Sequence, residues 1–200
     1  APASCLITRG LGTDDDASRA AVLDAVRLGV EHDVSIIQIR EKKLSGRSLF
    51  RLVEAAVEIT QRGATKLLVN DRADIAVAAG ADGVHLRSDS LPPSVIRTAF
   101  PHLLIGSSVH NADTAQDAVA DGADFVLFGP VFPTPGKTAS GVASLEDVCR
   151  RLRGFPVIAI GGIDADNLNE AFTAGAAGVA AIRSMNEPAS LRDMMRSLRQ

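Results

Sequence analysis

Short apolar runs alternate along the chain with longer segments in which apolar residues recur at helical spacing. Apolar runs of about four to eight residues between turn signals are typical of buried strands, and the longer periodic segments predict amphipathic helices. The predicted strands cover residues 4–8, 34–40, 66–70, 83–86, 103–108, 124–128, 156–160 and 178–182. The predicted helices cover residues 17–31, 45–62, 72–79, 92–99, 112–121, 143–153, 165–174 and 188–199.

Each predicted strand is followed by a predicted helix, an order that favours parallel strands joined by right-handed crossovers. Eight such units close into a barrel, so we predict an α/β protein with a single (β/α)8 TIM barrel over residues 1–200. A length of 200 residues is near the lower limit of this fold and requires short loops. An open doubly wound sheet is the alternative, but no Gly-x-Gly-x-x-Gly motif follows the first strand.

Three glycines stand between a predicted helix and the next predicted strand. They are Gly80, Gly122 and Gly175, and each is followed by a small residue before the strand begins. Helices commonly end at a residue in the left-handed conformation, which glycine adopts most easily. We therefore interpret these glycines as structural.

The composition and charge of the chain indicate which class of molecule it binds. The net charge is −3 and no basic stripe runs along the chain, which argues against nucleic acid and favours a small molecule. No apolar run reaches the roughly 20 residues that cross a bilayer, and no charged segment precedes an apolar one, so we expect a cytoplasmic protein without membrane contact. Cys5 and Cys149 are isolated, which favours two buried thiols over a zinc site or a disulfide. A homo-oligomer is compatible with this composition.

Polar residues close the second and third predicted strands, at the end of the barrel where active sites form. Strand alternation places Gln38, Arg40 and Lys42 on one face, an arrangement that suits an anion, although a solvated strand end is the alternative. Asn70 and Asp71 close the third strand. The carboxylate could hold Mg²⁺, or both side chains could cap the next helix.

Histidines follow the fourth and fifth predicted strands. We interpret His85 as a structural hydrogen-bond partner. Ser108 and His110 share a face beyond the apolar run and point toward the mouth of the barrel. A histidine there, with a pKa near neutrality, can move a proton, so Ser108 and His110 are the catalytic candidates.

The loop after the sixth predicted strand, 129–141, is the longest in the chain and holds three prolines and three glycines. Thr134 and Lys137 give it a tip that could bind an oxyanion, and an ordinary surface loop is the alternative. After the seventh and eighth strands, adjacent glycines and a following helix N-terminus predict a phosphate site. The residues expected to converge there are Gly161, Gly162, Arg183 and Ser184.

These motifs stand in the order and at the spacing of the thiamine phosphate synthase/TenI family, which the chain resembles over nearly its whole length. They are Gln38-x-Arg40-x-Lys42, Val69-Asn70-Asp71, Asp82-Gly83-Val84-His85, Gly129-Pro130-Val131-Phe132-Pro133-Thr134-x-x-Lys137 and Ile160-Gly161-Gly162-Ile163.

The resemblance implies one of two activities. Synthase members join a pyrimidine pyrophosphate to a thiazole phosphate with Mg²⁺ and release pyrophosphate. TenI members convert a thiazole carboxylate phosphate tautomer into its aromatic form, with a histidine that matches His110.

The resemblance also implies roles for single residues in a synthase. The positions that match pyrimidine or pyrophosphate contacts are Gln38, Arg40, Lys42 and Asn70, and Asp71 matches a metal ligand. Those that match pyrophosphate or thiazole phosphate contacts are Ser108, Thr134, Lys137, Gly161 and Gly162.

Two departures from the synthase pattern affect the expected activity. Ser90 stands where synthases carry a second metal-binding Asp, and Asp89, one residue earlier, is expected to point away. Gly136 stands where synthases usually carry Thr. We therefore favour a TenI-like thiazole tautomerase without a cofactor, with an Mg²⁺-dependent synthase as the alternative. A non-catalytic thiamine-related ligand-binding or regulatory protein is a further alternative.

Overall fold

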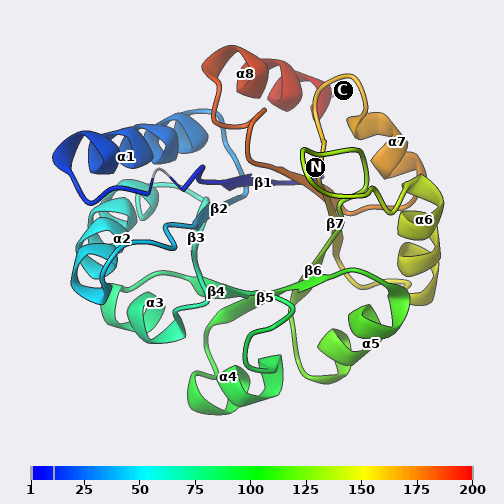
Figure 1. Cartoon of the computed structure of the whole chain (residues 1–200), viewed down its shortest axis with the longest axis horizontal. Coiled ribbons are helices and arrows are strands. Elements are labelled where there is room, and N and C mark those ends of the chain that lie inside the picture. Colours follow the sequence, from blue (N-terminus) through cyan, green and yellow to red (C-terminus); the bar gives the residue numbers. More distant parts are fainter. Residues whose placement is uncertain (1, 11, 200) are drawn as a thin grey trace.

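The computed structural model describes residues 2–10 and 12–199, and within them eight parallel strands close into a barrel in chain order, with β8 paired to β1 (Figure 1). The strands are β1 (Ala3–Ile7), β2 (Ile36–Ile39), β3 (Lys66–Asn70), β4 (Gly83–Leu86), β5 (Leu104–Val109), β6 (Phe125–Phe128), β7 (Val157–Ile160) and β8 (Gly178–Ala181). The predicted single (β/α)8 barrel is confirmed.

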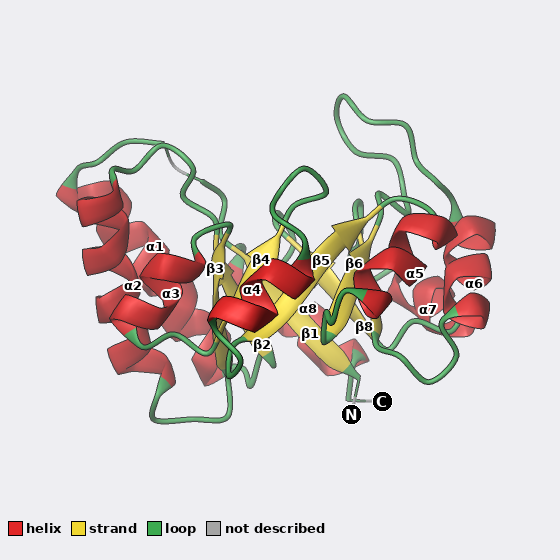
Figure 2. Ribbon diagram, turned by 90° about the horizontal axis from the view of Figure 1, so that it is seen from below, coloured by secondary structure: helices red, strands yellow, loops and turns green. Residues whose placement is uncertain are grey.

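Helices surround the strands as an outer layer (Figure 2). They are α1 (Asp16–Glu31), α2 (Gly46–Thr60), α3 (Ala73–Ala79), α4 (Pro93–Ala99), α5 (Ala112–Ala120), α6 (Val142–Arg151), α7 (Leu168–Thr173) and α8 (Pro188–Ser197). None of the helices in the described ranges is long and apolar enough to cross a membrane.

The seventh helix differs most from its prediction, because it begins at Leu168 rather than at residue 165. Asp164 accepts hydrogen bonds from the backbone N–H groups of Asp166 and Asn167, at 3.1 and 3.2 Å. Asn167 in turn accepts one from the N–H of Asp164, at 3.0 Å. Such side-chain bonds to the backbone offer an alternative to helical pairing, so the chain forms a turn here first.

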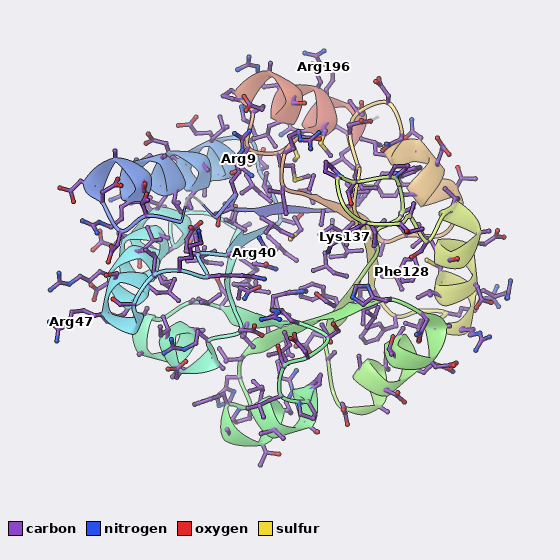
Figure 3. All side chains as sticks on the ribbon, viewed as in Figure 1. Arg9, Arg40, Arg47, Phe128, Lys137 and Arg196 are labelled. Carbon is purple, nitrogen blue, oxygen red and sulfur yellow. The ribbon has the colours of Figure 1, made fainter. Side chains whose placement is uncertain are left out.

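Strand alternation divides the apolar residues into two clusters. The inner cluster fills the barrel and consists of Cys5, Ile7, Ile36, Leu68, Phe125, Leu127, Ile158 and Ala180. The larger outer cluster lies between strands and helices, where Phe128 is fully buried (Figure 3). In β2, Ile37 and Ile39 belong to the outer cluster and Ile36 to the inner one, so Gln38 faces the barrel interior.

The glycines predicted to end helices do so. Gly80 is the left-handed C-cap of α3 with φ 77°, and Gly122 and Gly175 have φ values of 88° and 97°. Both cysteines are free thiols. Cys5 is buried inside the barrel, and burial raises its pKa to about 12. Cys149 is only half-buried on α6, so the prediction that it is buried was wrong, although desolvation still raises its pKa to about 11.

Candidate active site

A cavity of about 650 Å³ opens at the carboxyl ends of the strands and is within the usual size range of small-molecule sites. Each strand, or the residue directly after it, contributes to its floor. The polar half of the floor comes from β2 to β5 and consists of Gln38, Asn70, His85 and Ser108. The apolar half consists of Leu127, Ile160 and Ile7 from β6, β7 and β1, with Ile182 directly after β8. Such a floor suits a heterocycle, which has an apolar face and polar ring atoms.

Gln38 lies in the polar half with 2% of its surface exposed. Its amide nitrogen Nε2 has no hydrogen-bond partner in the described part of the chain. A buried donor without a partner costs free energy, and native proteins rarely leave one. Because Gln38 lines the cavity, a polar atom of a ligand could supply that partner.

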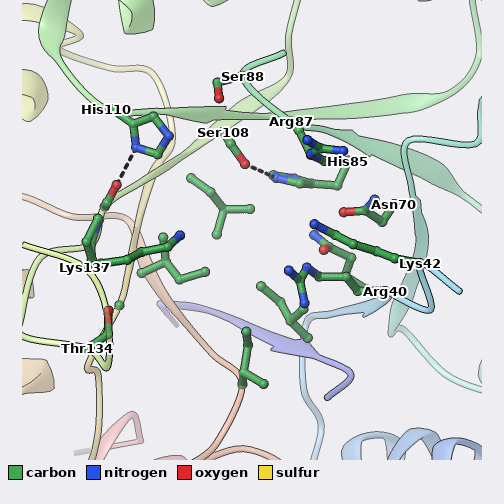
Figure 4. Close-up of a pocket in the computed structure, with 18 of the residues that line it drawn as sticks. Arg40, Lys42, Asn70, His85, Arg87, Ser88, Ser108, His110, Thr134 and Lys137 are labelled. Carbon is green, nitrogen blue, oxygen red and sulfur yellow. Dashed lines mark hydrogen bonds between the residues drawn. The ribbon is translucent and has the colours of Figure 1, made fainter. Parts of the chain in front are cut away.

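Cations face each other across the cavity. Arg40 and Lys42, predicted to share a face, both line it, and Arg87 joins them on the same wall (Figure 4). Lys137 approaches from the opposite side, whereas Arg47 points outward into solvent (Figure 3). The pKa of Lys42 is lowered by partial burial and then by the positive charges of Arg40 and Arg87. A bound anion would offset this mutual repulsion.

Buried His85 and half-buried Ser108 form a hydrogen-bonded pair in the polar half. The Nε2 atom of His85 lies 2.8 Å from Oγ of Ser108, which confirms that His85 is a hydrogen-bond partner. Burial lowers the pKa of His85 to about 4, so its ring is neutral at pH 7. A neutral ring can fix the Ser108 hydroxyl without adding charge to the floor.

His110 lines the cavity beside Ser108, as the sequence predicts. Its Nδ1 atom lies 2.6 Å from the carbonyl oxygen of Gly129. A carbonyl only accepts, so Nδ1 is the donor in this contact. The ring is turned with its other nitrogen toward the cavity (Figure 4). This geometry places the second ring nitrogen, Nε2, where it can exchange a proton with a ligand.

Backbone hydrogen bonds hold the base of the loop 129–141 and close a turn at its tip. The N–H groups of Val131 and Phe132 donate to the carbonyls of Ile160 and Gly161, at 2.9 and 3.0 Å. At the tip the N–H of Lys137 donates to the carbonyl of Thr134 at 3.1 Å, and both residues line the cavity.

Gly136 lies inside this tip turn with φ 75°. A β-branched residue adopts that conformation only with strain. A threonine at this position would therefore be strained in this turn.

Gly161 and Gly162 have φ values of 99° and 66° and lie against the base of the same loop. A Cβ on Gly161 would come within 2.5 Å of Pro130, and one on Gly162 within 2.8 Å of Phe132. Gly161 lines the cavity. The glycine pair therefore has a packing role in addition to the predicted approach to a phosphate.

Arg183 and Ser184 do not join the glycines at the cavity as expected. Arg183 is exposed, and neither residue lines the cavity. The hydroxyl of Ser184 donates to the carbonyl of Ile163 at 2.8 Å, so it ties the loop after β8 to the loop after β7. The expected helix N-terminus is also displaced, because α7 begins only at Leu168.

Asp71 is not a helix cap. Helix α3 has Arg72 at its N-cap and no side-chain cap bond, so the capping interpretation of Asn70 and Asp71 was wrong. Asp71 has φ 60°, uncommon for a residue other than glycine. Its Oδ1 accepts from the hydroxyl of Ser90 and, at 3.4 Å, from the N–H of Arg87. Its Oδ2 pairs with Nη1 of Arg87 at 3.4 Å.

The residues around Asp71 fit Mg²⁺ poorly. Both carboxylate oxygens already have partners, one of them a cation. Within residues 2–10 and 12–199, no group of three or more His, Cys, Asp or Glu side chains could hold a metal ion. Asp89 lines the cavity rather than pointing away, but it pairs with Nη2 of Arg87.

Sequence reasoning gave Arg87 no role. Its signal was its place directly after β4, at the end of the barrel where the other site residues were sought. Its contacts with both Asp71 and Asp89 depend on the turn at 87–90, in which the N–H of Arg87 donates to Oγ of Ser90 at 2.8 Å.

Comparison with known proteins identifies the family. A family profile described as thiamine monophosphate synthase matches residues 11–185. The chain belongs to this family. A protein of Geobacter sulfurreducens named putative thiamine-phosphate synthase is 45% identical over 82% of this chain and 79% of its own length. The thiamine-phosphate synthase of Chlorobium luteolum is 39% identical, covering 98% of this chain and 91% of its own.

A solved structure agrees with the family assignment. Thiamine phosphate pyrophosphorylase from Pyrococcus furiosus superposes with a TM-score of 0.87 at 29% identity, covering 98% of this chain and 95% of its own. The expectations of an enzyme of this family and of a place in thiamine biosynthesis are confirmed.

Proposed function

We propose that the protein is a thiamine-phosphate synthase, which joins a pyrimidine pyrophosphate to a thiazole phosphate and releases pyrophosphate. The observation that carries this proposal is the presence of cations on both walls of the cavity, with Arg40, Lys42 and Arg87 opposite Lys137. Two separated cationic walls suit two anionic groups bound together, as coupling requires. The names of the relatives favour the synthase over the tautomerase that the sequence alone favoured.

The charges on the cavity walls match the charge that coupling develops. The bond between the pyrimidine carbon and the pyrophosphate oxygen breaks while a bond to the thiazole forms, so negative charge builds on the leaving pyrophosphate. Fixed cations such as Arg40 and Lys42 lower the energy of that transition state. Lys137 and Thr134, from the loop opposite, would hold the thiazole phosphate.

The two halves of the floor would orient the rings. Gln38 and Asn70 can hydrogen-bond polar ring atoms, and Ser108 is fixed for the same purpose by His85. Leu127 and Ile160 offer an apolar surface to the ring faces. Holding two reactants in one orientation makes coupling effectively unimolecular.

A thiazole tautomerase is the second candidate, and His110 is the observation that favours it. Its Nδ1 donates to the carbonyl of Gly129, and its Nε2 is turned toward the cavity. Proton transfer by such a group would convert the tautomer into the aromatic thiazole.

One set of incubations separates these functions. The protein is given both coupling substrates, or the thiazole carboxylate phosphate tautomer alone, each with Mg²⁺ or with EDTA. Mass spectrometry detects thiamine phosphate, and ultraviolet absorbance detects aromatisation. Thiamine phosphate with an equal amount of pyrophosphate is the expected result. Aromatisation without coupling would favour the second candidate, and binding without either reaction would indicate a non-catalytic protein.

A further inference from the structure

Arg87 stands between two carboxylates at the edge of the cavity. Its Nη1 faces Oδ2 of Asp71 at 3.4 Å, and its Nη2 contacts Oδ2 of Asp89. The side chain lines the cavity and is 43% exposed. A single cation is therefore shared by Asp71 and Asp89.

We propose that Arg87 takes the place of a divalent cation at this edge, so that the cavity binds a pyrophosphate group without Mg²⁺. This inference rests on the proposed function only in its choice of pyrophosphate as the ligand. In this proposal Arg87 binds the pyrophosphate group directly, without a metal ion.

The contacts of Asp71 support the proposal. Mg²⁺ requires oxygen ligands in nearly ideal octahedral geometry. Here Oδ1 of Asp71 accepts from the Ser90 hydroxyl and Oδ2 faces the guanidinium, so a metal ion would have to displace Arg87. Ser90 adds no negative charge to hold that ion.

The chemistry of the guanidinium group supports direct binding of pyrophosphate by Arg87. Arginine carries five N–H donors in a planar fork and binds phosphate oxygens in pairs. The two carboxylates are contacted by Nη1 and Nη2, and the Nε–H of Arg87, a cavity-lining residue, has no partner among the residues that the structure describes. The charge of Arg87 also reaches Lys42, whose pKa it helps to lower after burial and Arg40. A pyrophosphate group placed there would meet three cations at once.

The test measures binding of inorganic pyrophosphate by calorimetry, first in EDTA and then in Mg²⁺. For the wild-type protein we expect affinities in the two conditions within about threefold of each other. Arg87→Ala should weaken binding in EDTA by about tenfold or more, the loss of one charge-assisted contact. The matched control is Arg72→Ala, because Arg72 has the same 43% exposure and also pairs with an aspartate, Asp74, but does not line the cavity.

A second measurement follows Mn²⁺ by electron paramagnetic resonance without pyrophosphate. The wild-type protein should leave Mn²⁺ free, and Arg87→Ala should bind it, because Asp71 and Asp89 then lack their cation. Arg87→Lys, which keeps the charge and loses the fork, should remain metal-free and bind pyrophosphate with intermediate affinity.

Three outcomes would overturn the proposal: wild-type binding only with Mg²⁺, no binding in either condition, or equal affinity of wild type and Arg87→Ala in EDTA. The wild-type comparison needs no variant and so does not depend on folding of a mutant. Metal-free, Arg87-dependent binding without any coupling would contradict the proposed function alone. Coupling that requires Mg²⁺ bound to the protein would contradict this inference alone.

Discussion

The Nε2 atom of His85 lies 2.8 Å from the hydroxyl oxygen of Ser108, and the histidine is buried on the floor of the cavity. This pair links the stability of the barrel to pH. Burial lowers the pKa of His85 from 6.5 to about 4, so the folded state binds the proton less tightly than the unfolded state. Stability should be complete above about pH 6.5 and fall as the pH drops toward about 4.

We expect this residue to contribute on the order of 3 kcal/mol to the loss of stability over that range, since one pKa unit corresponds to about 1.4 kcal/mol. His85→Gln should flatten the pH dependence of the free energy of unfolding, measured by urea denaturation at pH 7 and pH 4. His102→Gln serves as the control, because His102 is exposed. An unchanged slope in His85→Gln would show that folding does not lower the pKa of His85.

His110→Gln should separate the two candidate reactions. A positioned general base typically contributes about 10²-fold to 10⁴-fold in rate, so tautomerisation should fall by at least about 10²-fold. Coupling and the Kd of the ligand should change little, because the cations that hold the phosphates are untouched. Rates, Kd and melting temperature are measured on one preparation. Full tautomerisation with a lowered melting temperature would instead give His110 a structural role.

Gly162→Ala should destabilise the protein more than Gly154→Ala. Both glycines have positive φ, 66° and 85°, so both alanines incur a conformational cost of about 1 kcal/mol. Only at Gly162 would the new Cβ also meet Phe132 and the carbonyl of Pro133, each at 2.8 Å, whereas nothing lies within 4 Å at Gly154. We expect an additional loss of at least about 1 kcal/mol in urea denaturation.

The loop 129–141 should respond to the same change. Gly162→Ala should increase protease cleavage within this loop and weaken phosphate binding. Gly154→Ala should do neither, and equal effects of the two substitutions would exclude the close approach between the loops.

Ser90→Asp should create a metal site at the cost of stability without metal. The Ser90 hydroxyl donates to Oδ1 of Asp71, and a carboxylate in its place would repel Asp71 instead. We expect a lower melting temperature in EDTA and a rise of several degrees on addition of Mg²⁺ or Mn²⁺. Ser88→Asp is the matched control, because Ser88 lines the cavity without a hydrogen bond to Asp71. Equal responses to metal in the two variants would contradict this prediction.

The local pattern of apolar and polar residues was sufficient to predict the barrel and part of the site. Alternation along β2 placed Gln38 at the cavity, and alternation along β5 placed Ser108 there, because a strand fixes which face each residue occupies. Continuing the same alternation just past the strand ends also placed Arg40, Lys42 and His110 at the cavity. Residues farther from a strand end could not be placed in this way. Ser184 bonds to Ile163, a partner on another loop, and nothing in the local sequence encodes that pairing.

Arg87 and the glycine pair illustrate the same limit. The contacts of Arg87 join β3 to the turn after β4, so they arise from tertiary structure rather than from spacing. The approach of the adjacent glycines after β7 to a phosphate stays a prediction. The nearest neighbour of Gly162, however, is Phe132 from the loop after β6, a protein segment that the motif alone did not reveal.

The division of the cavity floor into a polar and an apolar half separates two parts of ligand recognition. Charge and hydrogen bonding depend on β2 to β5, whereas the shape offered to a ring depends on Leu127, Ile160 and Ile182 on the opposite side. A lineage that changed these three side chains could accept a differently substituted ring while its handling of phosphate stayed constant. New substrates and inherited chemistry would then evolve on opposite sides of one barrel.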